Sequence, residues 1–301
     1  TFKIKHISCL VLDEADEMLN MGFLEDIEWI IDQLPENKQM VLFSATMPNE
    51  IRNIAKKYLN DPAEILIKSV KKENQLISQK FIYVQRHHKL DALKRILELN
   101  NQGVIIFVRT KLLTISIAEA LENSGHTVAV LNGDIPQNQR ENTVDRLKKG
   151  FIDILVATDV AARGLDVERI KLVVNYDFPF DKETYTHRIG RTGRAGRSGE
   201  AILFVNQREK HFLRNLENAT RTNIEEISIP SNKTINEKRM ERLVENVNKS
   251  SLDQEENKAL IIDVLDNLKE KYSMDESNIA IAALNLVIGN KAFFVNEDDS
   301  W

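Results

Sequence analysis

Short apolar runs alternate with amphipathic stretches between residues 79 and 205, and this alternation constrains the fold more than any other feature of the sequence. The apolar runs have the length of buried strands, and the stretches between them carry apolar residues at helical spacing. Strands that alternate with helices predict a parallel sheet with right-handed crossovers and helices on both faces. The expected strands are 79–85, 103–108, 127–131, 152–157, 172–176 and 200–205, and the expected helices are 89–100, 113–124 and 136–150.

A shorter version of the same pattern precedes this region. Residues 7–12 and 39–43 are predicted as buried strands, and residues 24–34 and 48–59 as helices. Residues 68–77 are polar and show no periodicity, so they predict a linker. The sequence therefore predicts two α/β regions in one chain.

The composition is that of an ordinary globular protein, with 42% hydrophobic and 29% charged residues in 301. That length is enough for two domains. The single cysteine, Cys9, lies in an apolar run and is predicted as a buried strand residue in a reducing compartment, without a disulfide or thiolate metal site. No apolar stretch reaches membrane-spanning length and the N-terminus lacks a signal-peptide pattern, so we expect a cytoplasmic protein without a membrane partner.

The net charge of −5 is carried by the C-terminal part of the chain. Residues 232–301 hold nine Lys or Arg and fourteen Asp or Glu, which leaves 32 of each kind in residues 1–231. A neutral body can still present a basic groove, because the local charge decides phosphate binding. The acidic balance therefore does not exclude a nucleic-acid partner.

Acidic and hydroxyl side chains follow the two N-terminal strands. The first strand ends at Asp13-Glu14-Ala15-Asp16, and open α/β sheets bind ligands at the carboxyl ends of their strands. In a nucleotide site, Asp13 would hold Mg²⁺ through water and Glu14 would orient or deprotonate the attacking water. Taken alone, two acids after a strand are as often a helix cap. Ser44 and Thr46 follow the second strand, where hydroxyls are common turn formers.

Polar residues also follow the strands of the second region. Each is an ordinary loop or cap residue on its own, but together they line one edge of one sheet, as a ligand-binding track requires. These residues are Arg109, Thr110, Gly133, Asp134, Gln137, Arg140, Thr158 and Asp159.

The stretch from His187 to Arg194 carries three arginines, Arg188, Arg191 and Arg194, at spacings of three. Arginine forks bind phosphate oxygens in pairs and keep their proton, and the intervening glycines let a backbone come close. A single Arg-x-x-Arg is more often a solvated turn. The whole stretch favours a site for a multiply charged anion.

These motifs occur in the order that DEAD-box ATP-dependent RNA helicases show, and residues 1–230 resemble the latter part of such an enzyme. The resemblance implies a truncated first RecA-like domain in residues 1–67, which is the helicase ATP-binding part. A linker would follow in residues 68–77, and residues 78–230 would form a complete second RecA-like domain. It also implies ATP and Mg²⁺ as cofactors and RNA as a partner.

The resemblance assigns roles to individual residues. It makes Asp13, Glu14, Arg191 and Arg194 catalytic, with Asp13 holding Mg²⁺ through water and the two arginines reaching the γ-phosphate of ATP. It assigns coupling between domains to Asp16, Ser44, Thr46, His187 and Arg188, and nucleotide contacts to Gly164 and Asp166. It assigns RNA contacts to Arg109, Thr110, Gly133, Gln137, Arg140 and Thr158.

Members of this family carry a phosphate-binding loop upstream of the acidic motif, and the 301 residues contain no Gly-x-x-x-x-Gly-Lys-[Ser/Thr]. We therefore expect that the sequence is a piece of a longer protein and that this piece alone does not hydrolyse ATP. The alternative is a non-enzymatic, dimerising RNA-binding module. A DNA translocase shares the fold but usually lacks the combination of Asp-Glu-Ala-Asp with Ser-Ala-Thr.

Beyond residue 230 the strand pattern ends, and residues 236–248, 255–272 and 275–288 are predicted as helices. Ser273-x-x-Glu276 predicts a capping box for the last helix, and Gly289 predicts its end. Residues 231–292 resemble the helical dimerisation region of bacterial cold-shock DEAD-box helicases, with 293–301 as a tail. This implies an all-α tail, a homodimer, and a stress-response role in ribosome assembly or RNA decay at low temperature.

Overall fold

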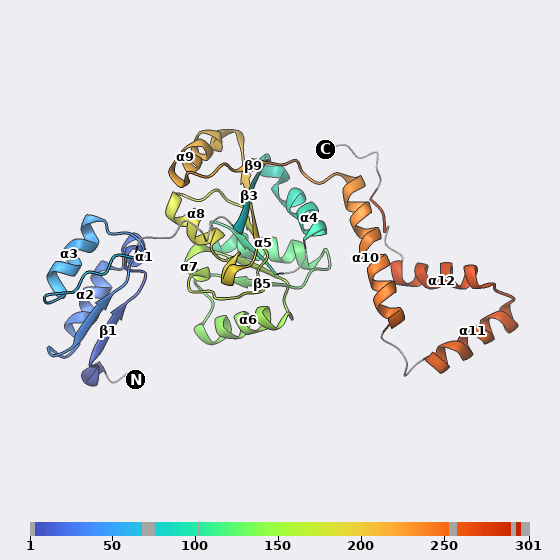
Figure 1. Cartoon of the computed structure of the whole chain (residues 1–301), viewed down its shortest axis with the longest axis horizontal. Helices are drawn as coiled ribbons and strands as arrows, with labels where there is room; N and C mark the ends of the chain where they lie inside the picture. Colours follow the sequence, from blue (N-terminus) through green and yellow to red (C-terminus); the bar gives the residue numbers. More distant parts are fainter. Residues whose placement is uncertain (1–3, 68–75, 101–102, 253–257, 290–292, 296–301) are drawn as a thin grey trace. The chain divides into compact units, whose positions relative to one another are not determined.

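The computed structural model describes residues 4–67, 76–100, 103–252, 258–289 and 293–295, which form two compact units that part after residue 69 (Figure 1). Most of the predicted linker, 68–77, lies outside the described residues. Its last residue is not a linker residue, because Ile77 is buried and begins strand β3, Ile77–Tyr83.

The N-terminal unit is built on two parallel strands whose carboxyl ends lie side by side, with Leu12 paired to Leu42. Helices pack on these strands around Leu12, Ile27 and Ile31. Apolar residues four positions apart on a helix share one face, which is why Ile27 and Ile31 enter this core together. The elements are η1 Ile4–His6, β1 Cys9–Leu12, α1 Ala15–Asn20, α2 Leu24–Asp32, β2 Gln39–Leu42 and α3 Asn49–Tyr58.

The prediction that Cys9 is buried was wrong: Cys9 lies on strand β1 but its side chain is exposed. Side chains alternate between the two faces of a strand. Leu10 and Leu12 point toward the apolar cluster of this unit, whereas Cys9 and Val11 point away from it and are exposed. An apolar run alone does not reveal that, among the described residues, other side chains cover only one face of strand β1.

The second unit contains a parallel sheet of seven strands in the order β5-β6-β4-β7-β8-β3-β9, which confirms the predicted α/β class. Because β4, β5 and β6 pair in parallel, their carboxyl ends lie at the same edge of the sheet. The remaining strands are β4 Val104–Phe107, β5 Val128–Leu131, β6 Ile154–Ala157, β7 Leu172–Asn175, β8 Gly199–Val205 and the short β9 Glu225–Glu226.

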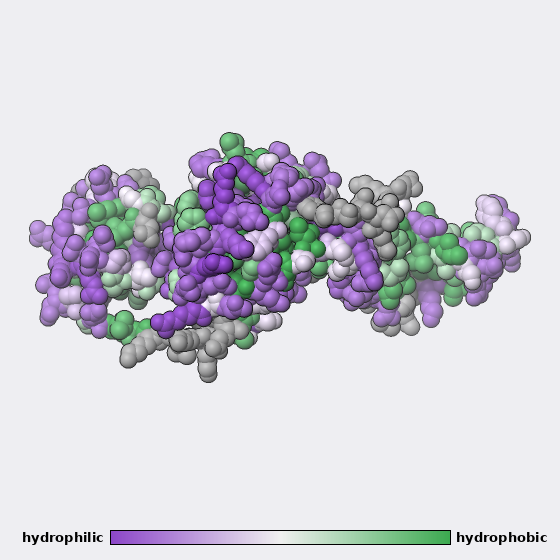
Figure 2. All heavy atoms as spheres, turned by 90° about the horizontal axis from the view of Figure 1, so that it is seen from above, coloured by the Kyte–Doolittle hydropathy of each residue, from purple (hydrophilic) through white to green (hydrophobic). Residues whose placement is uncertain are grey.

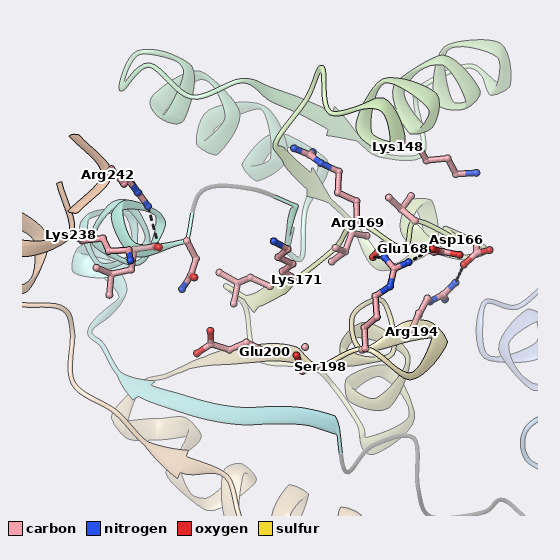
Figure 3. A pocket seen from close by; sticks show the side chains of 18 of the residues that line it. Lys148, Asp166, Glu168, Arg169, Lys171, Arg194, Ser198, Glu200, Lys238 and Arg242 are labelled. Atoms are coloured by element: carbon pink, nitrogen blue, oxygen red, sulfur yellow. Dashed lines mark hydrogen bonds and ion pairs between the residues drawn. The ribbon is translucent and has the colours of Figure 1, made fainter. Parts of the chain in front are cut away.

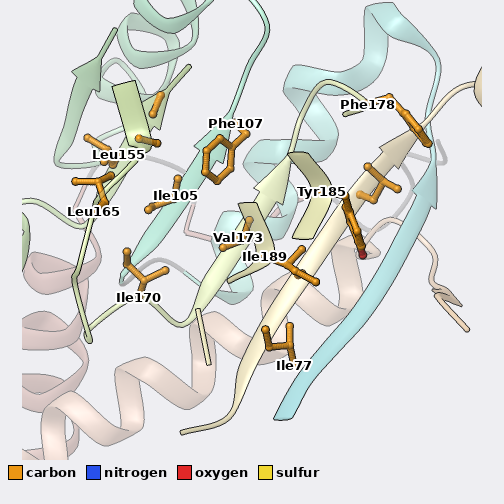
Figure 4. Close-up of a cluster of buried hydrophobic side chains, with 14 of the residues drawn as sticks. Ile77, Ile105, Phe107, Leu155, Leu165, Ile170, Val173, Phe178, Tyr185 and Ile189 are labelled. Atoms are coloured by element: carbon orange, nitrogen blue, oxygen red, sulfur yellow. The ribbon is translucent and has the colours of Figure 1, made fainter. Parts of the chain in front are cut away.

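Two apolar clusters cover the two faces of this sheet. Ile105 and Phe107 of β4 enter one cluster together with Tyr185 (Figure 4), and Val104 and Ile106 enter the other. All four β4 residues are almost completely buried, as expected for the central strand of a sheet with helices on both faces. The helices are α4 Lys89–Leu99, α5 Lys111–Glu122, α6 Gln137–Lys149, α7 Asp159–Ala162, α8 Lys182–Ile189 and α9 Lys210–Thr220.

A long helix, α10, Asn232–Leu252, follows the sheet and packs on α4. Arg239 donates to both carboxylate oxygens of Glu98, and Arg242 donates to the Leu99 carbonyl at 3.1 Å. Such forked contacts fix an orientation better than a single point charge does. Helix α10 starts four residues earlier than predicted.

Helices α11, Lys258–Tyr272, and α12, Glu276–Ile288, end the described tail. The predicted capping box was wrong: Asp275 is the N-cap and accepts from the Asn278 amide at 2.7 Å, while Ser273 has a φ of 53°. Gly289, with φ 74°, ends α12 as predicted. Figure 2 shows apolar side chains on the surface of this tail. No helix in the described ranges is both long and apolar enough to cross a membrane.

Candidate functional site

Strand β1 delivers two carboxylates to the edge of the N-terminal unit. Asp13 follows the strand directly, and the Glu14 amide donates to its Oδ1 at 2.9 Å. Glu14 has φ 50° and ψ 45°, a left-handed conformation that is uncommon for a residue other than glycine. This turn leads the chain at once into α1. Asp13 stays exposed and Glu14 half-buried at the strand end.

The loops that follow β1 and β2 are joined through Asp16. Thr46 donates to Asp16 Oδ2 twice, from its amide at 2.8 Å and from its hydroxyl at 2.6 Å. Ser44 accepts from the Asp16 amide at 3.3 Å and donates to the Thr46 carbonyl at 2.6 Å. The structure thus brings the predicted residues Asp16, Ser44 and Thr46 into one network beside Asp13 and Glu14.

The Asp16 carboxyl is buried, and burial acts to raise its pKa. The hydrogen bonds from the Thr46 hydroxyl and amide favour the charged form, and together with further hydrogen bonds they outweigh burial. The net effect is a pKa below the ordinary value, so Asp16 is an anion held in place near neutral pH.

In the second unit, Arg188 of α8 lies only 2% exposed among the strand ends. Its guanidinium binds both carboxylate oxygens of Asp159, at 2.6 and 2.8 Å, and donates to Asn175 Oδ1 and the Asp177 carbonyl. This arginine ties α8 to the loops after β6 and β7. All of these contacts of Arg188 lie within the second unit.

Arg191 and Arg194 differ in their surroundings. Arg191 is 7% exposed and donates to the backbone carbonyls of Leu165, at 2.9 Å, and His187, at 3.2 Å. Arg194 is more accessible, donates to the Gly190 carbonyl at 2.9 Å, and pairs with Asp166, whose side chain is 75% exposed. The predicted nucleotide residue Asp166 and the predicted catalytic residue Arg194 therefore lie together at the surface.

Two positions near the arginine stretch, Gly199 and Gly164, are glycine for different physical reasons. A Cβ at Gly199 would lie 2.6 Å from the Gly193 nitrogen and 2.4 Å from the Thr192 hydroxyl, so packing excludes any side chain there. Gly164, with φ 67°, has no atom within 4 Å of such a Cβ. Its backbone is thus open to a ligand, as its predicted nucleotide contact requires.

The residues predicted to bind RNA follow the carboxyl ends of β4, β5 and β6. The Arg109 guanidinium lies over the Phe180 ring at 4.5 Å, and its amide donates to Asp177 at 2.8 Å. Thr110 caps α5 by accepting from the Leu113 amide at 3.2 Å. Thr158 occupies the N-cap position of α7, but its side chain makes no capping hydrogen bond.

Three further predicted residues complete this edge. Arg140 donates to the Arg163 carbonyl at 2.6 Å, and Gln137 donates to Glu141 at 2.9 Å. A Cβ at Gly133 would be in ordinary contact with the Lys111 side chain, 3.6 Å away. The sequence reasoning missed Lys111, which pairs with Asp134, and it missed Phe180, which is 72% exposed. The one feature of the sequence that could have indicated Lys111 and Phe180 is that each follows the end of a strand.

No group of three or more His, Cys, Asp or Glu residues that could hold a metal occurs in the described chain. This is compatible with a magnesium ion bound mainly by phosphate and water, since Mg²⁺ keeps several waters and uses one or two carboxylates. Asp13 suits that role because it is exposed and offers hard oxygen donors. His87 and His88 lie in the short helix η3, Arg86–His88, where His87 is exposed and His88 is half-buried.

Three family models match the chain. They are the DEAD/DEAH box helicase at residues 1–54, the helicase conserved C-terminal domain at 88–196, and the RNA helicase DeaD dimerization domain at 230–298. The second match includes strands β4 to β7 of the parallel sheet, and the third includes helices α10, α11 and α12.

Among similar proteins, the ATP-dependent RNA helicase DeaD of Escherichia coli is 47% identical over 99% of this chain and 48% of its own length. The protein of the same name from Mycobacterium tuberculosis is 50% identical over 82% of this chain and 44% of its own length. The chain thus spans about half the length of the curated relatives that it matches.

Solved structures of similar fold include S. cerevisiae Dbp5 bound to RNA and ADP BeF3, with a TM-score of 0.67 and 32% identity over 82% of this chain and 64% of that chain. A DEAD box protein from Methanococcus jannaschii has a TM-score of 0.50 and 42% identity, over 75% of this chain and 61% of that chain. Together with the acidic loop, the Asp16 network and the arginine stretch from His187 to Arg194, these matches show that the chain belongs to the DEAD/DEAH box helicase family.

Proposed function

We propose that the complete protein is an RNA-dependent ATPase that separates short RNA duplexes. The observation that carries this proposal is the acidic loop: Asp13 and Glu14 stand at a strand end, beside a loop that is fixed through Asp16 and Thr46. Relatives of the chain are named ATP-dependent RNA helicases. The proposed place of action is the cytoplasm, and the proposed context is RNA metabolism at low temperature.

The catalytic roles follow from the chemistry of each side chain. Asp13 would hold Mg²⁺ through water, and that ion would neutralise charge on the phosphates. Glu14 would orient the attacking water and accept its proton, and Arg191 and Arg194 would neutralise charge that develops on the transferred phosphoryl group. Gly164 and Asp166 would contact the nucleotide beside Arg194.

RNA would bind along the carboxyl edge of the second sheet. Arg109, Thr110, Arg140 and Thr158 would contact the sugar–phosphate backbone, with Gly133 and Gln137 completing the track. The proposed role of Ser44, Thr46, Asp16, His187 and Arg188 is to couple ATP and RNA binding. Backbone and 2′-hydroxyl contacts would favour RNA over DNA without reading base sequence.

The test is ATP hydrolysis by the full-length protein with and without RNA. Glu14→Gln should bind ATP nearly as well as the wild type while turnover is abolished, because the amide can hold water but cannot accept its proton. Glu36→Gln, at an exposed position of the same unit, is the control and should keep full turnover.

Normal hydrolysis in Glu14→Gln would remove Glu14 from the catalytic role. Turnover that DNA stimulates as well as RNA would favour the translocase alternative. Absence of hydrolysis in the wild type, with RNA binding retained, would favour the non-enzymatic binding module.

We also propose that the helical tail, residues 231–292, forms a homodimer. Several apolar side chains of α11 and α12 are exposed, among them Leu260 at 65% and Leu286 at 84%. Short helices with uncovered apolar faces gain stability by packing on a partner. The match of residues 230–298 to the DeaD dimerization domain points to a second copy of the same chain.

A further inference from the structure

A large basic groove lies at the edge of the second sheet opposite to the proposed RNA track. We call it the basal groove: its volume is about 1530 Å³, and it is lined by residues around Lys171 and Gly199, at the starts of β7 and β8, and by helix α10. The proposed RNA contacts follow the carboxyl ends of strands, whereas Lys171 precedes the amino end of β7. The groove meets the proposed nucleotide residues at one end, at Asp166 and Arg194.

The lining of the groove holds more basic than acidic side chains. Eight of its lining residues are Lys or Arg and four are Asp or Glu. Three of these four acids are neutralised by ion pairs: Asp166 by Arg194, Glu168 by Arg197, and Glu200 by Lys80.

Three exposed lysines of the groove, Lys148, Lys171 and Lys249, form no ion pair with any residue that the structure describes. They come from three different elements, at the end of α6, before β7 and near the end of α10. Figure 3 shows Lys171 between Lys238 and Arg242 of α10 on one side and Lys148 on the other. These three lysines, together with Lys238 and Arg242 of α10, line one groove.

Helix α10 contributes its basic side to this space. Lys238, Arg242 and Lys249 are separated by four and seven residues, which places them on one face of the helix, and Glu245 is the one acid of α10 among the lining residues. This is notable because residues 232–301 carry a net charge of −5. The contacts of Arg239 with Glu98 and of Arg242 with the Leu99 carbonyl hold the helix on α4.

We propose that the basal groove binds the phosphate backbone of a single-stranded RNA segment, as a second RNA site of the protein. The volume exceeds the roughly 300–1,000 Å³ of small-molecule pockets, which favours a polymer over a single small anion. Lysines act as point charges on flexible stems, so they suit a backbone without base recognition. The choice of RNA as the polyanion rests on the proposed function.

The experiment measures binding of labelled single-stranded RNA to the full-length protein by fluorescence anisotropy across a salt series. One RNA is long, and one is just long enough for the track at Arg109 and Arg140. The groove variant combines Lys148→Gln, Lys171→Gln and Lys249→Gln. The matched control combines Lys56→Gln, Lys233→Gln and Lys258→Gln, at exposed positions outside the groove.

For the long RNA, the slope of log affinity against log salt should become shallower by about 2 in the groove variant, from roughly 0.7 for each of three lost phosphate contacts. The control variant should keep the wild-type slope, and binding of the short RNA should not change in either variant. Thermal melting should show the same midpoint for all three proteins, since the lysines are exposed.

An unchanged slope in the groove variant would overturn the groove proposal while leaving the proposed function intact. Absence of short-RNA binding in the wild type would instead contradict the proposed RNA track. Inorganic tripolyphosphate serves as a second probe. If it binds the wild type but not the groove variant, while both bind long RNA with equal slopes, the groove is a site for small polyanions and the RNA proposal is wrong.

Discussion

Thr46 donates two hydrogen bonds to the same carboxylate oxygen of Asp16, from its amide at 2.8 Å and its hydroxyl at 2.6 Å. A buried carboxylate with two such donors is stabilised in its charged form, and its pKa is lowered accordingly. The loop after β2 is thereby tied to the loop that carries Asp13 and Glu14.

The first prediction concerns pH. Because the folded-state pKa of Asp16 is lowered, its contribution to stability is present above the unfolded pKa of about 3.9 and is lost as the pH falls through the folded value. Thr46→Val should raise the pKa of Asp16 and move acid unfolding to higher pH. NMR titration of the Asp16 carboxyl and circular dichroism across pH check this. Thr46→Ser keeps the hydroxyl and should behave as the wild type; equal acid unfolding of the Val and Ser variants would contradict the argument.

The second prediction separates the two arginines that follow α8. In the full-length protein, Arg194→Ala and Arg191→Ala should each lower ATP turnover by on the order of 10³–10⁵, the scale of an arginine finger. Arg191→Ala should also lower the melting temperature, because Arg191 is buried and bonded to two carbonyls.

Arg208→Ala, at an exposed position, is the control for both measurements. A loss of less than tenfold in turnover for both variants would make Arg191 and Arg194 structural residues.

The third prediction concerns the pair of Arg188 with Asp159. Asp159→Ala leaves the buried guanidinium without its carboxylate, and we expect unfolding free energy to fall by about 3 kcal/mol, as for other broken buried pairs. Glu168→Ala breaks the exposed pair with Arg197 and should cost less than about 1 kcal/mol. Urea unfolding gives both values. Similar small losses of unfolding free energy for the two variants would show that the Arg188–Asp159 pair stabilises the fold no more than the exposed pair does.

The fourth prediction addresses the proposed dimer with a point change rather than a deletion, because α10 packs on α4 and its removal would expose that helix. Leu286→Glu should convert a dimer into a monomer, since Leu286 is 84% exposed and a charge cannot be buried at an apolar interface without a partner. Lys233→Glu is the control. Sedimentation that gives a monomer for the wild type would exclude the dimer.

Much of the second sheet could be predicted from apolar runs, since Val104–Phe107 is buried on both faces and such strands read as continuous apolar segments. Helices α8 and α9 were not predicted; Tyr185 and Ile189 of α8, and Leu213 and Leu216 of α9, enter the core from them. The capping box predicted at Ser273 does not form, because Asp275 lies directly before α12 and accepts from the Asn278 amide.

Residue types and spacing identified the candidate site, but not its pairing. That Arg188 binds Asp159 and that Arg194 pairs with Asp166 depends on crossovers that bring residues 28 or 29 positions apart into contact. Those distances in sequence carry no local pattern. The exposure of Cys9 depends likewise on which strand face is covered.

The contacts of Arg188 also have a mechanical consequence. Its guanidinium binds Asp159, the neighbour of Thr158, and the carbonyl of Asp177, whose carboxylate holds the Arg109 amide. Helix α8 is therefore tied directly to the loop that carries Thr158 and, through Asp177, to the loop that carries Arg109, so a displacement of either loop involves the helix as well. We therefore expect α8 and these two loops to move together as one body within this unit.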